Sequence, residues 1–209
     1  MSRAGALSGV RHKNDRFSGA LAKRSNPCVG STFTATVKEW YAGLALRYFI
    51  TFACYGAHLH GDESGSVDRH HNVPGTRVAE ANPERIAIKR QQMDQVPYLL
   101  DQHRRATVLD ALREVCLHLG WSLWAAHVRT NHVHAVVEAE VRPEKIMHAF
   151  KSYASRNLNR QGIDEPDRKR WARHGSTRWL WKDEDVQKAI HYIVSGQGEP
   201  MEVHRAELV

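Results

Sequence analysis

From residue 47 onward, the hydrophobic and polar positions follow patterns that predict strands and helices. Alternation, or a short β-branched and aromatic run, predicts a strand, and a one-sided apolar stripe predicts an amphipathic helix. Strands are predicted over 48–55, 121–128, 132–139 and 178–181, and helices over 108–119, 143–158 and 183–194, with a short helix starting near 82–83. This β-α-β-β-α-β-α order favours an α+β fold, with a ferredoxin-like or RRM-like antiparallel sheet and helices.

The segments outside these patterns define the predicted domain organisation. Residues 1–44 are rich in Ser, Gly, Ala and basic residues and show no sustained period, which predicts a basic, disordered arm. Residues 45–200 are predicted to form one folded domain, and residues 201–209 a C-terminal tail. Two loops are predicted inside the domain, a polar one over 56–83 and a basic one over 161–176.

Two histidines, His132 and His134, flank one apolar residue in the strand predicted over 132–139. Side chains alternate across a strand, so both imidazoles share one face while Val133 and Ala135 share the other. Neighbouring imidazoles on an open face are suited to metal binding. However, 14 histidines in 209 residues predict roughly one His-x-His by chance, and a second pair occurs at 58–60. The metal-binding interpretation of the His132–His134 pair therefore needs support from the rest of the sequence.

The charge of the chain points to a polyanionic partner. There are 30 basic and 23 acidic residues, a net charge of +7. Between Val141 and Lys182 we count 11 Lys or Arg against four Asp or Glu, an excess that equals the whole net charge. Most of these cations are arginines, which suit bidentate phosphate contacts. This distribution favours nucleic acid as the partner.

The cysteines and the hydropathy limit the compartment. Three cysteines, Cys28, Cys54 and Cys116, are widely spaced and contain no C-x-x-C, so reduced thiols are expected and a disulfide framework is not. No apolar run approaches the length of a membrane span, and the N-terminus lacks the apolar region of a secretory signal. A cytoplasmic, nucleoid-associated protein is expected.

At this point the sequence resembles a known family. Asn131-His132-Val133-His134, an apolar strand, an amphipathic helix, a Trp/Arg segment and a Tyr-Ile helix are similar to the single-tyrosine HUH transposases. The nearest branch is the REP-associated tyrosine transposases and related insertion-sequence transposases of bacteria. Tyr-Gly-x-x-Leu-His-Gly-Asp at 55–62 and Gly-Ser-Val-Asp-Arg at 65–69 also resemble that group. The resemblance covers roughly residues 47–200 and implies the HUH endonuclease fold.

The resemblance implies a specific chemistry. Members of the family cut single-stranded DNA near hairpins, with Mg²⁺ or Mn²⁺ held by the two histidines. A tyrosine forms a covalent 5′-phosphotyrosine and releases a free 3′-hydroxyl, and the reverse reaction joins strands. By motif, His132 and His134 are the expected metal ligands and Tyr192 the expected nucleophile. A covalent intermediate conserves the energy of the broken bond, which agrees with the absence of a G-x-x-x-x-G-K-[ST] motif.

Two tyrosines follow the histidine pair in predicted helices, and the apolar stripes separate them. Tyr153 lies on the stripe of its helix, seven residues after Ile146, and is expected to pack in the core. Tyr192 lies off its stripe, beside Lys188, where a hydroxyl can reach DNA. An amphipathic tyrosine at a helix edge is the alternative for Tyr192.

The third metal ligand departs from the family pattern. Relatives often carry an amide four residues after the tyrosine, and position 196 here is glycine. Gln197 is the expected substitute, provided that the helix ends or bulges at Ser195–Gly196. His127 is expected to face the histidine pair across the hairpin as a structural histidine.

The expected DNA contacts are cations in the basic region and on the last helix: Lys151, Arg156, Arg160, Arg173, Arg178 and Lys188. Single-stranded or hairpin DNA is the expected partner, for a monomer or a homodimer. Two alternatives stay open beside the strand transferase. One is an inactive, domesticated relative that only binds structured single-stranded DNA or RNA. The other is a hydrolytic nuclease that uses the histidines with zinc and needs no tyrosine.

Overall fold

The structure, a computed structural model, describes residues 46–59 and 82–207 of the chain. The elements in chain order are β1 (Leu46–Cys54), α2 (Pro83–Gln91), α3 (Gln102–Leu119), β2 (Ser122–Val128), β3 (His132–Ala139), α4 (Pro143–Arg160), β4 (Trp171–Trp179), α5 (Asp183–Ser195) and β5 (Glu202–Arg205). The arm predicted over 1–44, most of the loop predicted over 56–83, His60 and the motif at 65–69 lie outside the described residues.

The five strands form one antiparallel sheet in the order β4-β1-β3-β2-β5. β3 lies between β1 and β2, and β1 lies between β3 and β4, so α3 and α4 are the crossover helices of two interlocked β-α-β units. This is the ferredoxin-like arrangement with one added edge strand, and the predicted α+β class is confirmed. The predicted hairpin of β2 and β3 is also confirmed.

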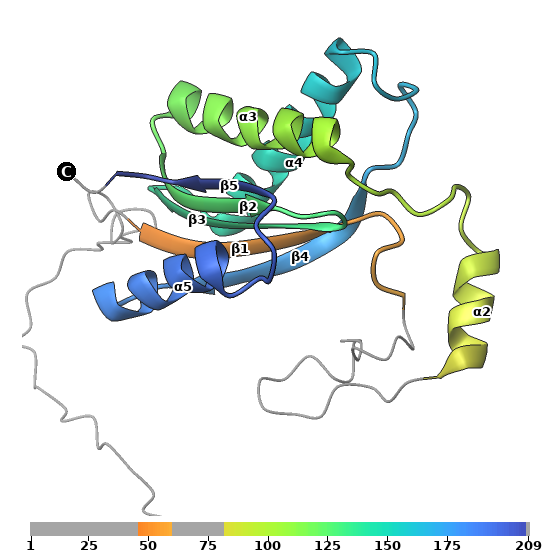
Figure 1. The fold of residues 1–209 in the computed structure, drawn as a ribbon, viewed down its shortest axis with the longest axis horizontal. Helices are drawn as coiled ribbons and strands as arrows, with labels where there is room; N and C mark the ends of the chain where they lie inside the picture. Colours follow the sequence, from red (N-terminus) through yellow and green to blue (C-terminus); the bar gives the residue numbers. More distant parts are fainter. Residues whose placement is uncertain (1–45, 60–81, 208–209) are drawn as a thin grey trace, which may run out of the picture. The chain divides into compact units, whose positions relative to one another are not determined.

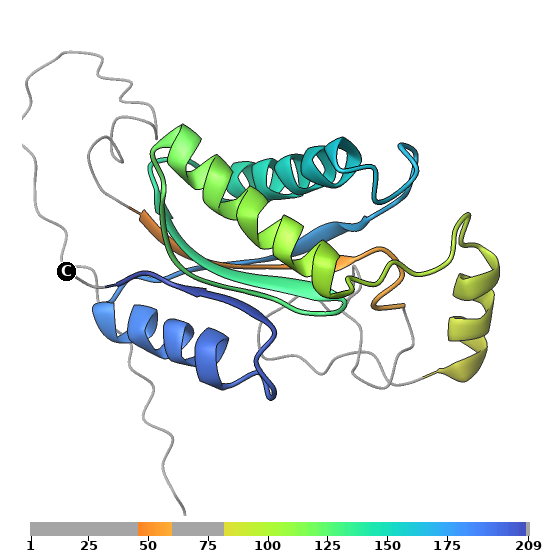
Figure 2. The same ribbon diagram turned by 45° about the horizontal axis from the view of Figure 1, so that its top comes forward.

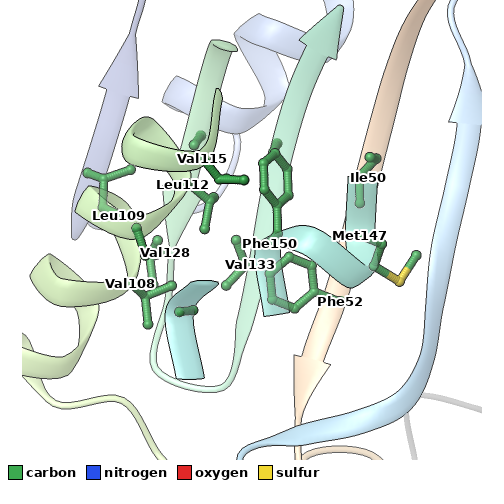
Figure 3. Close-up of a cluster of buried hydrophobic side chains, with 14 of the residues drawn as sticks. Ile50, Phe52, Val108, Leu109, Leu112, Val115, Val128, Val133, Met147 and Phe150 are labelled. Carbon is green, nitrogen blue, oxygen red and sulfur yellow. The ribbon is translucent and has the colours of Figure 1, made fainter. Parts of the chain in front are cut away.

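The two faces of the sheet are covered differently. α3 and α4 lie on one face and α5 on the other, as Figures 1 and 2 show. The larger core lies beneath α3 and α4, and Ile50 and Phe52 of β1 lie beside Met147 and Phe150 of α4 (Figure 3). A smaller cluster lies beneath α5 and contains Val136 of β3. α5 packs against β2, β3 and β5, which leaves the β1–β4 side of its face open.

Local signals explain several helix ends. Asp101 precedes α3 and accepts a hydrogen bond from the Arg104 backbone N–H, a side-chain N-cap. α3 ends at Gly120, whose φ of +68° is favourable only for glycine. Asn82 caps the short helix α2 in the same way, which confirms the helix predicted to begin there. Among the helices of the described ranges, none has the length and apolar character needed to cross a bilayer.

Two sequence predictions were wrong at the edges of the sheet. The fourth strand is not limited to 178–181: β4 covers Trp171–Trp179 and includes residues 171–176 of the basic segment predicted as a loop. The predicted C-terminal tail contains β5, which pairs with β2. Both are edge strands, in which backbone pairing to one neighbour determines the structure and polar side chains are tolerated.

Candidate metal and nucleophile site

The two histidines lie side by side on β3, on the sheet face that α5 covers. Their ring centroids are 4.7 Å apart. Val133, Ala135 and Val137 point into the core on the opposite face, as the alternation predicted. His134 is 7% exposed and His132 is partly buried, so the pair is sheltered but remains reachable from one side.

Each imidazole is held at Nδ1 by an oxygen. Nδ1 of His132 lies 2.7 Å from Oδ1 of Asn131, and Nδ1 of His134 lies 2.7 Å from Oγ1 of Thr51, its cross-strand neighbour on β1. An amide oxygen only accepts, so the His132 ring donates from Nδ1 and carries its lone pair on Nε2. The hydroxyl of Thr51 can donate or accept, so it can accept from Nδ1–H of His134 in the same tautomer. Metal-binding histidines are commonly oriented by such a hydrogen bond at the other ring nitrogen.

The environment keeps both imidazoles neutral. Burial, together with a smaller contribution from the neighbouring His132, lowers the pKa of His134 to about 4. Burial also lowers the pKa of His132, whereas the Gln197 side chain raises it. A neutral imidazole is the form that binds a metal, because the cation has no free lone pair.

Tyr192 stands beside this pair on α5. Its side chain is 46% exposed, and its ring centroid lies 5.7 Å from that of His134 and 6.1 Å from that of Phe49 on β1. The apolar stripe of α5 packs beneath the helix and leaves Tyr192 at the rim. Tyr153 instead packs against the main core, with the Arg156 guanidinium 4.1 Å from its ring centroid. The structure therefore places the two tyrosines as the stripes predicted.

Gln197 lies beside both imidazoles. Its side chain is close enough to raise the pKa of His132 and of His134, although it lies five residues after Tyr192. This is feasible because α5 ends at Ser195, with Gly196 as the C-cap, so Gln197 leaves the helical path. A Cβ at position 196 would lie 2.9 Å from the Tyr192 carbonyl oxygen and 3.1 Å from Cδ2 of its ring. Because glycine has no side chain, position 196 leaves room for the Tyr192 ring.

These groups line one cavity of about 460 Å³, formed by β1, β3, β4 and α5. Its polar lining consists of Thr51, His58, Asn131, His132, His134, His174, Ser176, Tyr192 and Gln197. All of them belong to a single chain. Sequence reasoning missed His174 and Ser176, because it did not predict this part of β4, and it gave no role to Thr51 or to the side chain of Asn131.

The donor set fits a divalent cation. Two neutral imidazoles and one amide oxygen are ligand types that Mn²⁺ and related ions accept. Within 46–59 and 82–207, no group of three His, Cys, Asp or Glu side chains could hold a metal ion. The amide of Gln197, which lines the same cavity, is an oxygen ligand of another type.

His127 occupies a different position from the pair. It lies opposite His134 on β2 and is fully buried, and burial lowers its pKa. Both ring nitrogens are engaged: Nδ1–H donates to the Ile193 carbonyl oxygen at 2.9 Å, and Nε2 accepts from the Met201 N–H at 3.2 Å. With no nitrogen free, His127 is a structural histidine and not a ligand, as the sequence predicted.

The cations expected to contact DNA are spread over two faces of the sheet. Lys151, Arg156 and Arg160 belong to α4, on the face opposite the cavity. The Lys151 amine donates to the carbonyl oxygens of Ala172 and His174 and thereby ties β4 to α4.

The other three lie on β4 and α5. Arg173 and Arg178 are exposed on β4, and the Arg178 guanidinium lies 5.6 Å from the Phe49 ring centroid. Lys188 is exposed on α5, one turn before Tyr192. Arg178 and Lys188 are therefore the two that belong to the face with the cavity.

The comparison with known proteins gives one family match. Residues 95–193 match the family model described as "Transposase IS200 like", and this segment contains His132, His134 and Tyr192. The match confirms the resemblance to this transposase family that the sequence predicted. No protein of curated description matches the chain.

Two solved structures are similar to the chain at low sequence identity. One is a REP-associated tyrosine transposase bound to a REP hairpin, with 10% identity, a TM-score of 0.41 and coverage of 73% of this chain and 66% of that one. The chain thus spans just under two thirds of that transposase. The other is a candidate transposase of Deinococcus radiodurans R1, with 15% identity, a TM-score of 0.38 and coverage of 78% and 94%.

Proposed function

We propose that the protein is a metal-dependent DNA strand transferase that cuts and rejoins single-stranded DNA near a hairpin through Tyr192. The observation that supports this most is the position of the Tyr192 ring, 5.7 Å from the His134 ring in one cavity of a single chain. No residue of a second copy is needed to bring the phenol and the imidazoles together.

The reaction balances without an external energy source. The phenolic oxygen of Tyr192 attacks the phosphorus of a DNA phosphodiester, and the bond from phosphorus to the 3′ oxygen breaks. The phenolic proton leaves to solvent, which the half-exposed side chain allows, and the 3′ oxygen gains a proton. The product is a 5′-phosphotyrosine, and a 3′-hydroxyl that attacks it restores a phosphodiester and frees the tyrosine.

His132, His134 and Gln197 are the side chains that would hold Mg²⁺ or Mn²⁺. A bound divalent ion neutralises charge on the non-bridging oxygens of the phosphate and orients it for in-line attack. Asn131 and Thr51 hold the angle of each imidazole, and the Asn131 oxygen also fixes the tautomer of His132, so the metal-facing nitrogens are preorganised. Phe49 packs against both His134 and Tyr192 and fixes their relative position.

DNA would approach from the open β1–β4 side of the cavity. Arg178 and Lys188 flank this side and supply positive charge, and the Arg178–Phe49 pair offers a flat surface for an unpaired base. The cations of α4 lie on the opposite face, where they are suited to a more distant part of the same hairpin. The choice of hairpin DNA as the substrate is based on the family resemblance.

The test is formation of a covalent protein–DNA adduct. The full chain is incubated with 5′- or 3′-labelled, hairpin-bearing single-stranded DNA and Mn²⁺, then denatured and separated by electrophoresis. We expect a shifted band that carries the DNA 3′ to the cut and that disappears with EDTA and in Tyr192→Phe. Tyr153→Phe is the matched control, because that ring packs against the core, and it should form the adduct at the wild-type rate.

Three outcomes would overturn the proposal. An adduct that persists in Tyr192→Phe would exclude this nucleophile. Hairpin binding that is equal with and without EDTA, and without any adduct, would indicate a binding-only relative. Free 5′-phosphate ends formed independently of Tyr192 would indicate a hydrolytic nuclease.

A further inference from the structure

A buried histidine under α5 is the polar group that stands out in this part of the sheet. The layer between α5 and the sheet is apolar and includes Ala125, Val136, Val186, Ala189, Ile190 and Ile193. His127 lies on the same face and is fully buried. A buried imidazole without hydrogen-bond partners would destabilise the folded protein. The two hydrogen bonds of His127 therefore indicate a defined structural role.

The first hydrogen bond replaces one that the end of α5 lacks. In a continuing helix, the carbonyl oxygen of Ile193 would accept from the N–H four residues later, which belongs to Gln197. α5 ends at Ser195, so this carbonyl has no further helical residue to accept from. Nδ1–H of His127 donates to it at 2.9 Å. The bond stabilises a helix end from which Gln197 is free to turn toward the imidazoles.

The second hydrogen bond fixes the chain beyond Gln197. The Met201 N–H donates to Nε2 of His127 at 3.2 Å, immediately before β5 pairs with β2. Nearby, the Arg129 side chain donates to the carbonyl oxygen of Glu199 at 3.0 Å. One imidazole thus ties both ends of the 193–201 segment to β2. Tyr192 directly precedes this segment, and Gln197 lies in its middle.

We propose that His127 is a positioning residue, which holds the 193–201 segment so that the phenol of Tyr192 and the amide of Gln197 face the His132–His134 pair together. The inference rests on the proposed function, in which those two side chains act on one phosphate. His127 contacts neither DNA nor metal. It acts through its hydrogen bonds to the backbone of Ile193, which follows Tyr192, and of Met201, which lies beyond Gln197.

Three substitutions separate the two hydrogen bonds. His127→Phe keeps the ring and removes both bonds. His127→Asn keeps a donor near the position of Nδ1 and can restore the bond to Ile193. His127→Gln places an amide oxygen near the position of Nε2 and can restore acceptance from Met201. Val128→Ala removes buried volume from the neighbouring position on the opposite face and is the control for a general loss of core packing.

The kinetic measurement is the rate of adduct formation at saturating hairpin DNA and Mn²⁺, at a temperature at which each variant is folded by circular dichroism. In His127→Phe we expect this rate to fall on the order of 10- to 100-fold, with the DNA dissociation constant within about twofold of wild type. His127→Asn and His127→Gln should each recover part of the rate. Val128→Ala should keep the wild-type rate although its stability falls.

A second measurement does not depend on activity. Without metal and DNA, amide hydrogen exchange of peptides covering 192–201 should be at least about tenfold faster in His127→Phe, with α4 peptides unchanged. If His127→Phe does not fold, the same comparison is made with His127→Asn and His127→Gln.

The two proposals fail in different ways. If the wild-type protein forms no adduct, the proposed function is contradicted. If exchange over 192–201 is nevertheless faster in His127→Phe than in wild type, the anchoring of 193–201 by His127 is established. Wild-type adduct together with an unchanged rate and unchanged exchange in folded His127→Phe contradicts the positioning role alone.

Discussion

The hydroxyl of Thr51 lies 2.7 Å from Nδ1 of His134, across the pairing of β1 with β3. The two residues are 83 positions apart in sequence, and the antiparallel register places them directly opposite one another. Thr51 thereby holds the orientation of the His134 ring, and its hydroxyl can accept from Nδ1–H in the tautomer that leaves Nε2 free for a metal. Its neighbour on the same strand face, Phe49, stacks on the His134 ring at 5.5 Å between centroids.

Replacing Thr51 with valine should therefore weaken metal binding without removing a ligand. Val has the same shape and β propensity but cannot accept a hydrogen bond, so the Nδ1–H of His134 loses its partner. The affinity for Mn²⁺, measured by electron paramagnetic resonance, is expected to fall about 10- to 100-fold. Thr177→Val on β4 is the control with the same chemical change. Equal affinity in Thr51→Val and wild type would contradict the orienting role.

The elements with strong apolar patterns were predictable from the sequence. The stripes of α3, α4 and α5 and the alternation in β3 each arise from burial of one side against the core, which is a local property of the sequence. Most of β4 and all of β5 were missed because their strand character comes from pairing with β1 and β2. In β4, the four consecutive residues 173–176 are all exposed, so no alternation of hydrophobic and polar residues marks this part of the strand.

The candidate site divides in the same way. The common face of His132 and His134 follows from the period of two, and the rim position of Tyr192 follows from the stripe of α5. Gln197 can approach both imidazoles only because α5 ends at Ser195. The sequence indicated this as a requirement, since the glycine at 196 permits a helix end there. The partners of the imidazoles, above all Thr51, depend on strand register between distant segments, and no local pattern specifies it.

Gln197 should contribute to metal affinity through its amide oxygen. Its side chain lines the cavity with both histidines, and no third His, Cys, Asp or Glu of the described residues completes a metal-binding group. We expect Gln197→Ala to lower Mn²⁺ affinity by about tenfold or more and Gln197→Glu, which keeps an oxygen ligand, to retain most of it. Titration of Mn²⁺ with each purified variant measures this. Ser195→Ala, just before the turn, is the control, and equal affinity of Gln197→Ala and wild type would exclude this ligand.

A side chain at position 196 should impair activity more than folding. The φ of −92° is accessible to alanine, but the new Cβ would lie 2.9 Å from the Tyr192 carbonyl oxygen, so the end of α5 has to shift locally. The new Cβ would come within 3.1 Å of Cδ2 of Tyr192 and displace the ring. In Gly196→Ala we expect adduct formation to slow by roughly tenfold or more while DNA affinity stays unchanged. A variant that forms adduct at the wild-type rate would show that the ring position is not critical.

The stability of the metal-free protein should depend on His134 below pH 6.5. Its pKa is about 4 in the folded protein against 6.5 for the free side chain, so between these values the unfolded chain binds a proton that the folded chain does not. The free energy of unfolding therefore falls as the pH falls through this window, whereas above pH 6.5 His134 has no effect. Between pH 7.5 and 5.5, urea denaturation in EDTA should show about 1 kcal/mol more loss in wild type than in His134→Asn. Equal losses would contradict the lowered pKa.

Arg178 should contribute to DNA binding at the cavity, and Arg160 supplies a matched comparison on the other side of the sheet. Arg178 is exposed on β4 with its guanidinium 5.6 Å from the Phe49 ring centroid, beside the open edge of the cavity. Arg160 is equally exposed, at the end of α4 on the opposite face. Each change to alanine removes one positive charge, so any difference between them comes from position.

For a short single strand that contains the cut site but no hairpin stem, we expect Arg178→Ala to weaken binding about 5- to 100-fold, the loss of one stacked base. The slope of log affinity against log salt should become shallower by about 0.7, one phosphate contact fewer. Arg160→Ala should leave this ligand's affinity within about twofold. Equal losses in the two variants would show that the basic charge acts as a diffuse field. The strand would then not follow the β1–β4 side of the cavity.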